Sequence, residues 1–391
     1  MGCDQSTVVE HNKDLFNSIE FGSFKAKNRV IMAAMTRCRA DAKTGTPTDI
    51  HVKYYSERAE DAGVVFTECS SVSARGNNLP GSTCIYNKDH MVGWKKVVDA
   101  VHEKKGRIFS QMYHCGRIGN TGLLGGQRPV APSSVKMRHD KTCEEPEELD
   151  IKGIKSIIKE FVDSAKLLKE TGFDGVELLA GNGYIVDQFL CDATNKRTDE
   201  YGGSIEKRSK FLLEIIDGLS SVFGANKVGA KLSFGGRYND MFDSDPVSLM
   251  NFVFQELNKR KICFVEIVRP PEGHPAPNLY GIKGEDQIPD VFKDLKKKLS
   301  NVTIVGNCSF TPDEANKLIG EKVIDMVSFA KNYLANPDLC NRIKNKWELA
   351  QPDWATLYGP FGEKGYTDYP KYKKPEEKKP EEKTNTEKVS K

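Results

Sequence analysis

The chain has 391 residues, of which 38% are hydrophobic and 29% charged, and its mean hydropathy of -0.52 is typical of a soluble globular protein with enough apolar side chains for a full core. Its formal net charge of +3 gives no electrostatic basis for binding nucleic acid, and no apolar run approaches the roughly 18 residues of a membrane span. The ten cysteines include no Cys-x-x-Cys pair, which argues against a zinc ribbon or a small disulfide scaffold and favours reduced thiols in the cytoplasm.

Short β-branched segments alternate with amphipathic stretches from residue 28 to about 345, the pattern of parallel strands joined by helices. Eight strands are predicted, at 29–34, 63–68, 107–112, 175–180, 228–233, 263–268, 302–307 and 326–331. The helices between them include 93–104, 154–170 and 205–223, with Ser204 as the cap of the third. Eight repeats of strand and helix predict one closed (β/α)8 TIM barrel over residues 14–370 rather than an open sheet.

Two flanking segments lie outside the predicted barrel. Residues 1–13 form an N-terminal extension that begins Met-Gly-Cys-Asp-Gln-Ser and lacks the apolar segment of a secretory signal. This start fits N-myristoylation at Gly2 with palmitoylation at Cys3, which would anchor the chain to the cytosolic face of a membrane, although a chance match explains so short a pattern equally well. Residues 371–391 carry eight Lys and five Glu in a near-repeat of Lys-Lys-Pro-Glu-Glu-Lys, a composition that predicts a disordered tail.

The chemistry of such a barrel is expected where its strands end, because the loops after the strands build the active site. The predicted strand ends carry Met35-Thr36-Arg37, Thr67-Glu68-Cys69, Gln111-Met112-Tyr113-His114, Gly181-Asn182-Gly183-Tyr184, Lys231-Leu232-Ser233, Gly306-Asn307 and Ala330-Lys331. The histidines lack the partner spacing of metal ligands, so no metal site is predicted.

These segments resemble the old yellow enzyme family. The resemblance is carried by NRVIMAAMTRCRA at 28–40, GFDGVE at 172–177, NGY at 182–184, DQFL at 187–190, RTDEYGGSIE at 197–206 and GYTDYP at 365–370, and it covers roughly residues 14–372. It implies an ene-reductase: a barrel that binds FMN at its mouth, takes hydride from NAD(P)H and reduces a small electron-poor alkene.

The resemblance also implies which residues hold FMN. Thr36 would lie near the flavin O4 edge, Gln111 on the pyrimidine side and Lys231 beside N1 and O2, where a cation stabilises the anionic reduced flavin. The remaining cofactor-binding residues would be Ala34, Cys69, Gly306, Asn307, Ala330 and Lys331. The chain departs from the family at Lys231, which is usually arginine, and at Ala330-Lys331, which usually reads Gly-Arg at the phosphate.

For the substrate, the resemblance makes Tyr184 the proton donor and Asn182 a donor to the substrate carbonyl oxygen, with Tyr113 and Tyr366 lining the pocket. Leu179 occupies the position where most members have a histidine that also binds this oxygen, so one donor is missing. Structural roles for the same residues, as core aromatics or as a turn asparagine, stay open.

Three readings of the chain remain. The first is a working ene-reductase, either a monomer or a homodimer. The second is a drifted family member that binds flavin or a ligand with weak or altered activity, as the changes at Leu179, Ala330 and Lys331 would allow. A phosphate-binding aldolase or isomerase is disfavoured, because no Schiff-base lysine or paired carboxylate is recognisable at a strand end.

Overall fold

A computed structural model describes residues 12–138, 140–235, 238–270, 288 and 290–373. Within them, eight parallel strands close into a barrel in the order β4, β3, β13, β12, β11, β10, β9, β6, and β6 pairs back with β4. These strands are β3 (Val30–Met32), β4 (Val64–Phe66), β6 (Ile108–Tyr113), β9 (Gly175–Leu179), β10 (Val228–Leu232), β11 (Phe264–Val268), β12 (Thr303–Asn307) and β13 (Met326–Phe329). Each coincides with a predicted strand, and the predicted (β/α)8 barrel is confirmed.

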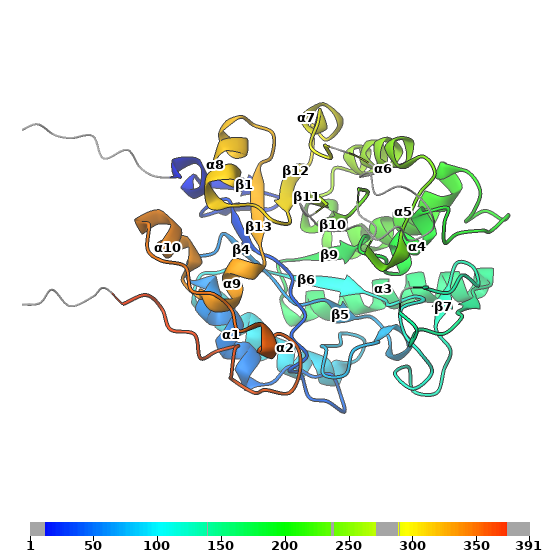
Figure 1. Cartoon of the computed structure of the whole chain (residues 1–391), viewed down its shortest axis with the longest axis horizontal. Coiled ribbons are helices and arrows are strands. Elements are labelled where there is room, and N and C mark those ends of the chain that lie inside the picture. Colours follow the sequence, from blue (N-terminus) through cyan, green and yellow to red (C-terminus); the bar gives the residue numbers. More distant parts are fainter. Residues whose placement is uncertain (1–11, 139, 236–237, 271–287, 289, 374–391) are drawn as a thin grey trace, which may run out of the picture.

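Helices surround the strands (Figure 1). They are α1 (Asp49–Ala59), α2 (Lys88–Glu103), α3 (Ile151–Thr171), α4 (Ile185–Leu190), α5 (Ile205–Phe223), α6 (Pro246–Arg260), α7 (Leu295–Lys298), α8 (Pro312–Gly320), α9 (Lys331–Ala335) and α10 (Leu339–Asn345). Helix α2 begins five residues earlier than predicted, because the Asn87 side chain caps it by accepting from the His90 N–H. Ser204 caps α5 as predicted. No helix in the described ranges is long and apolar enough to cross a bilayer.

Several short elements were not predicted. A hairpin of β1 (Ile19–Phe21) and β2 (Phe24–Ala26) precedes the barrel, β5 (Ser70–Ser71) extends the pairing of β6, and β7 (Val130–Ala131) pairs with β8 (Glu147–Glu148). The eighth strand is shorter than predicted, since Lys331 already begins α9. Most of the N-terminal extension and the charged tail lie outside the described residues, so the predictions for them stay predictions.

Phenylalanine rings fill the end of the barrel interior nearest the hairpin. Phe21 of the hairpin and Phe66 of β4 both stack on Phe264 of β11 with ring centroids 5.2 Å apart, and Phe109 of β6 completes the group. The strands between these rings carry glycine for lack of space: a Cβ on Gly229 would lie 2.2 Å from the Phe264 ring. The hairpin thus closes this end with a dry apolar layer.

We expect Gly229→Ala to destabilise the fold by about 1–3 kcal/mol, because the added methyl group collides with Phe264 in a packed interior. Chemical unfolding would measure the loss. Gly122→Ala is the matched control, since Gly122 is exposed and only an Asn120 side-chain oxygen, at 3.3 Å, would come near an added methyl group. Adding Phe264→Leu should make the two effects clearly non-additive; simple additivity would contradict the proposed collision.

Candidate active site

A layer of polar side chains lies directly above the phenylalanine layer, toward the C-terminal ends of the strands. It consists of Gln111, Glu177, Lys231, Glu266, Asn307 and Ser328, one from each of six adjacent strands. Most of them stand two residues beyond an apolar or glycine position of the layer below, because alternate residues of a strand point to the same side. All six are less than 9% exposed.

Hydrogen bonds join this layer across the barrel. The Gln111 Nε2 donates to Glu177 Oε2 at 2.6 Å, and the Asn307 Nδ2 donates to Ser328 Oγ at 2.7 Å. Ser328 in turn donates to Glu266 Oε1 at 2.7 Å, and Lys231 Nζ lies 3.0 Å from the same oxygen. Burial would lower the pKa of Lys231, but the charge of Glu266 and its hydrogen bond to Lys231 raise it above its usual value, so Lys231 is a cation. The sequence did not indicate this carboxyl pair, because the two glutamates lie mid-strand in separate repeats.

The turn after β9 has a backbone that needs particular residues. Asn182 has φ 57° and Gly183 has φ 77°, both in the left-handed region that asparagine and glycine tolerate best. The Asn182 N–H donates to Ser233 Oγ at 2.7 Å, and its carbonyl accepts from Asn239 Nδ2 at 2.8 Å. The main chain of Asn182 is therefore fixed, while its half-buried side chain remains available at the barrel mouth.

Tyr184 follows this turn at the start of α4, and two hydrogen bonds fix the main chain of Gly183 immediately before it. Asp187 Oδ2 accepts from the Gly183 N–H at 2.8 Å, and Gln188 Nε2 donates to the Gly183 carbonyl at 2.7 Å, which explains the Asp-Gln pair after the tyrosine. Burial raises the pKa of the Tyr184 hydroxyl well above its usual value, and the nearby Cys69 raises it further. The phenol is therefore protonated at neutral pH.

Tyr184 borders a small apolar cluster formed by Cys69, Tyr113, Cys115, Leu124 and Leu179. The rings of Tyr113 and Tyr184 meet edge to face with centroids 5.4 Å apart, and the Tyr113 hydroxyl donates to Asn77 Oδ1 at 3.1 Å. The structure therefore brings Leu179, Tyr113 and Tyr184 together, and their roles toward a substrate stay predictions. Thr36 and Cys69 also meet, with the hydroxyl and the thiol 2.9 Å apart.

His114 is held in place at the start of the loop after β6. It is buried, and its Nδ1 accepts from the Gly116 N–H at 3.1 Å. Burial lowers the pKa of His114 to about 3, so the ring stays neutral. It is a structural histidine that fixes the loop after β6.

The C-terminal segment forms one wall of the mouth and is attached to the loop after β3. The buried guanidinium groups of Arg37 and Arg39 donate to main-chain carbonyls within residues 356–365 at 2.7–3.5 Å. Tyr366 is fully buried, and its ring stacks on Tyr54 of α1 with centroids 3.9 Å apart. Its predicted place in the substrate pocket remains a prediction, since these contacts belong to packing between α1 and the segment.

Sequence reasoning missed two tyrosines near Tyr184. Tyr238 and Tyr358 are both largely exposed, and both raise the pKa of Tyr184, which puts their phenol groups close to it. Neither lies in a segment that the sequence motifs single out. The sequence does not reveal the path of a loop, so it could not indicate that these tyrosines lie near Tyr184. They are candidates for the rim of the substrate entrance.

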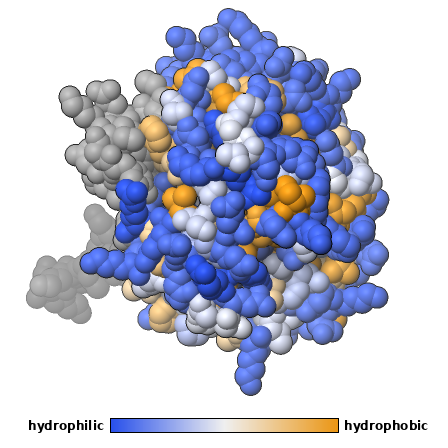
Figure 2. All heavy atoms as spheres, turned by 90° about the vertical axis from the view of Figure 1, so that its right-hand side faces the viewer, coloured by the Kyte–Doolittle hydropathy of each residue, from blue (hydrophilic) through white to orange (hydrophobic). Residues whose placement is uncertain are grey.

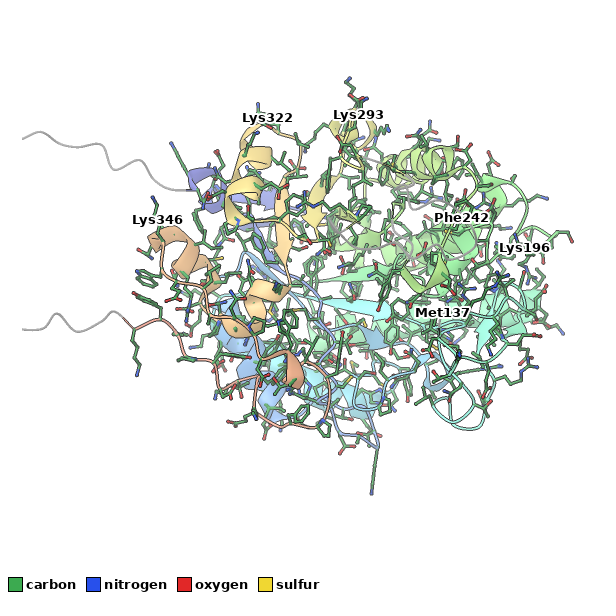
Figure 3. The ribbon with its side chains drawn as sticks, viewed as in Figure 1. Met137, Lys196, Phe242, Lys293, Lys322 and Lys346 are labelled. Atoms are coloured by element: carbon green, nitrogen blue, oxygen red, sulfur yellow. The ribbon has the colours of Figure 1, made fainter. Side chains whose placement is uncertain are left out.

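Three loops pack together beside the Asn182 turn. Buried Arg117 donates to the carbonyls of Val135, Asn239 and Asp240 at 2.9–3.2 Å, the Lys196 N–H donates to Ser133 Oγ, and the Ala193 N–H donates to the Phe242 carbonyl. Met137, Lys196 and Phe242, one from each loop, lie at the same end of the molecule in Figure 3. The face at that end is mostly hydrophilic, with apolar side chains in separate small groups (Figure 2).

The expected flavin has a ring end and a phosphate end, and the side chains at both places fit it. The amide nitrogen of Gln111 donates to Glu177, which leaves its amide oxygen as an acceptor for a ligand. Lys231 donates one N–H to Glu266, and its ammonium group has further N–H donors for a ligand. Ala330 has φ −94°, so an alanine there is unstrained and the expected glycine is not required by the backbone. Lys331 is exposed, with its ammonium 5.4 Å from the Trp354 ring.

The chain is similar to known flavin oxidoreductases along most of its length. Residues 14–350 match the sequence model of the NADH:flavin oxidoreductase / NADH oxidase family. It is 34% identical to the flavin oxidoreductase hxnT of Emericella nidulans, over 91% of this chain and 97% of the relative. It is 37% identical to a probable flavin mononucleotide-dependent alkene reductase of Leishmania infantum, over 89% of this chain and 95% of the relative.

Solved structures share the fold. The old yellow enzyme of Trypanosoma cruzi superposes with a TM-score of 0.86 at 29% identity, covering 92% of this chain and 99% of that one. The old yellow enzyme homologue of Zymomonas mobilis gives a TM-score of 0.84 at 31% identity, covering 91% of this chain and 99% of that one.

Proposed function

The chain belongs to the NADH:flavin oxidoreductase / NADH oxidase family, and from this premise we propose that it is an FMN-dependent ene-reductase of the old yellow enzyme type. The observation that carries this function is that the site holds both a cationic Lys231 inside the barrel and a protonated Tyr184 at its mouth. An anionic reduced cofactor needs the first, and alkene reduction needs a proton from the second. The substrate is a small electron-poor alkene.

We propose that the same residues hold the cofactor that the sequence predicted. Thr36, Gln111 and Lys231 would bind the ring edge, with Ala34 and Cys69 beside it. The turn after β12 at Gly306 and Asn307, together with Ala330 and Lys331, would hold the phosphate. When bound, FMN supplies the hydride that it receives from NAD(P)H.

The chain's own contribution to the reaction is positioning and proton delivery. The Asn182 amide would donate to the carbonyl oxygen of the substrate, and its fixed main chain keeps that donor in place. The Tyr184 hydroxyl would give its proton to the alkene carbon next to the carbonyl. Leu179, 3% exposed and apolar, gives the oxygen nothing, so Asn182 acts without the second donor usual in this family.

The reading as a drifted binding protein fits less well. It rested on the changes at Leu179, Ala330 and Lys331, whereas the chain matches a flavin oxidoreductase family over residues 14–350 and a probable alkene reductase over 89% of its length. Denaturation of the purified protein should release FMN; release of FAD, or no flavin after reconstitution with FMN, would overturn the cofactor assignment.

Tyr184→Phe should slow alkene reduction by about 10²–10⁴-fold while leaving reduction of the bound flavin by NAD(P)H nearly unchanged, because the hydroxyl acts only when the alkene is protonated. Stopped-flow measurements separate the two half-reactions. Tyr86→Phe, which changes a half-buried tyrosine outside the site, is the control. Equal slowing of both half-reactions would remove Tyr184 from the donor role.

Leu179→His should raise the rate with a cyclic enone relative to that with a nitroalkene by about tenfold or more, because a restored donor helps most where the alkene is least activated. Binding of phenols, measured by titration of the flavin absorbance, should tighten as well. Leu179→Met keeps the size and apolarity of the side chain and should leave the ratio unchanged. A folded, flavin-loaded Leu179→His protein with an unaltered ratio would show that Leu179 is not at the oxygen-binding position.

We further propose that the enzyme works in the cytoplasm as a monomer or homodimer, and that its N-terminus is acylated in a eukaryotic host. The nine cysteines of the described residues are all free thiols, which supports a reducing compartment. Because one acyl chain binds membranes weakly, Cys3→Ser should release the protein from membranes without removing the myristoyl group, whereas Gly2→Ala should remove both modifications. Intact-mass measurement after expression in such a host tests this, and an unmodified wild-type N-terminus would overturn it.

A further inference from the structure

Two carboxyl groups and one lysine are buried together in the centre of the barrel. Glu177 and Glu266 are 0% exposed and Lys231 is 6% exposed. They stand on the adjacent strands β9, β10 and β11, and Lys231 is the register partner of Glu266. Two full negative charges and one positive charge would leave an uncompensated charge in a dry interior, which is strongly unfavourable.

The hydrogen bonds of the two carboxyl groups leave one oxygen of each without a donor. Glu266 Oε1 accepts from Lys231 and Ser328, and Glu177 Oε2 accepts from Gln111. Glu177 Oε1 and Glu266 Oε2 are buried and receive nothing from the rest of the described protein. The two carboxyl groups are nevertheless in hydrogen-bond contact with each other. A single proton between them satisfies both oxygens at once.

We propose that Glu177 carries this proton and donates it to Glu266, and that the Glu266 carboxylate is a positioning residue that holds Lys231 toward the flavin and offsets part of its charge. The inference rests on the proposed FMN site. With the proton on Glu177, the three groups carry no net charge, because the negative Glu266 balances the positive Lys231. Lys231 remains a cation beside the pyrimidine ring. Ser328 and Asn307 fix Glu266 from the other side.

The electrostatics agree with this assignment of the proton. Burial raises the pKa of Glu177 well above its usual value, and the adjacent Glu266 charge raises it further. Burial would raise the pKa of Glu266 too, but Lys231 and hydrogen bonds from Glu177 and Ser328 hold it below its usual value. Glu177 is therefore the member that stays neutral.

Infrared spectroscopy of the flavin-loaded protein tests the proton directly. At about pH 9, where carboxyls of pKa near 7 are ionised, the wild type should show a carboxylic-acid band that shifts in deuterated water and is missing from Glu177→Gln. Glu160→Gln, which changes a partly buried glutamate on the outer helix α3, should keep the band. A wild-type spectrum identical to that of Glu177→Gln would overturn the shared proton.

The midpoint potential of bound FMN tests the effect of Glu266 on Lys231. Glu177→Gln replaces a neutral group by a neutral one, so the ratio of affinities for reduced over oxidised FMN should change by less than about threefold. Adding Glu266→Gln to it leaves Lys231 unopposed, and the ratio should rise at least about tenfold, which is about 30 mV for a two-electron couple. Redox-dye titration of the flavin-loaded proteins measures both.

The outcomes separate this inference from the proposed function. A tenfold rise in Glu177→Gln alone would mean that Glu177 is ionised, and an unchanged ratio in the double variant would mean that Glu266 does not govern Lys231; either overturns the inference while FMN binding stands. If the double variant does not fold, the infrared comparison of wild type with Glu177→Gln still decides where the proton lies. A wild-type protein that holds no FMN would instead overturn the cofactor site, and with it the role assigned to Glu266.

Discussion

The ion pair between Lys231 and Glu266 lies inside a closed barrel, where either charge alone would be strongly destabilising. It persists because hydrogen bonds hold the layer around it: Ser328 donates to the same carboxylate, Asn307 donates to Ser328, and Gln111 donates to the neighbouring Glu177. Six of the eight strands contribute to this layer, so the site is built on the most rigid part of the fold rather than on its loops. The positions of the barrel strands thus determine where the charges of the cofactor site lie.

Alternate residues of a strand point to the same side of the sheet, and this links the position of the charged layer to the packing of the layer below it. Two residues before Lys231 and Glu266 on their strands stand Gly229 and Phe264, which belong to the dry layer closed by the hairpin. A one-residue shift of a strand's register would turn both its ring and its charge to the other face, and a two-residue shift would put the charge where the ring packs, so the apolar layer also fixes the height of the polar one. Packing at the closed end therefore keeps the charges in position at the open end.

Much of the fold was predictable from the sequence, because eight short apolar segments with helices between them admit few architectures. The residues at strand ends were found through motifs, and Tyr184, Tyr113 and Leu179 do meet in one cluster. The Glu177–Glu266 pair was not, since the direction of a mid-strand side chain depends on the register of a closed sheet that no single segment reveals. Tyr358 escaped for another reason: its loop is held in place by Arg37 and Arg39, more than three hundred residues earlier in the chain.

That attachment has a consequence for biosynthesis. Arg37 and Arg39 are made early, yet the carbonyls that satisfy their guanidinium groups come from residues 356–365, among the last of the barrel to leave the ribosome. Until then two cations that end up buried lack most of their hydrogen-bond acceptors, and one wall of the mouth is missing. The nascent chain can assemble most of its strands during translation, but this wall of the mouth is completed only when synthesis is nearly finished. A premature stop codon that removes this segment would therefore affect the start of the chain as much as its end.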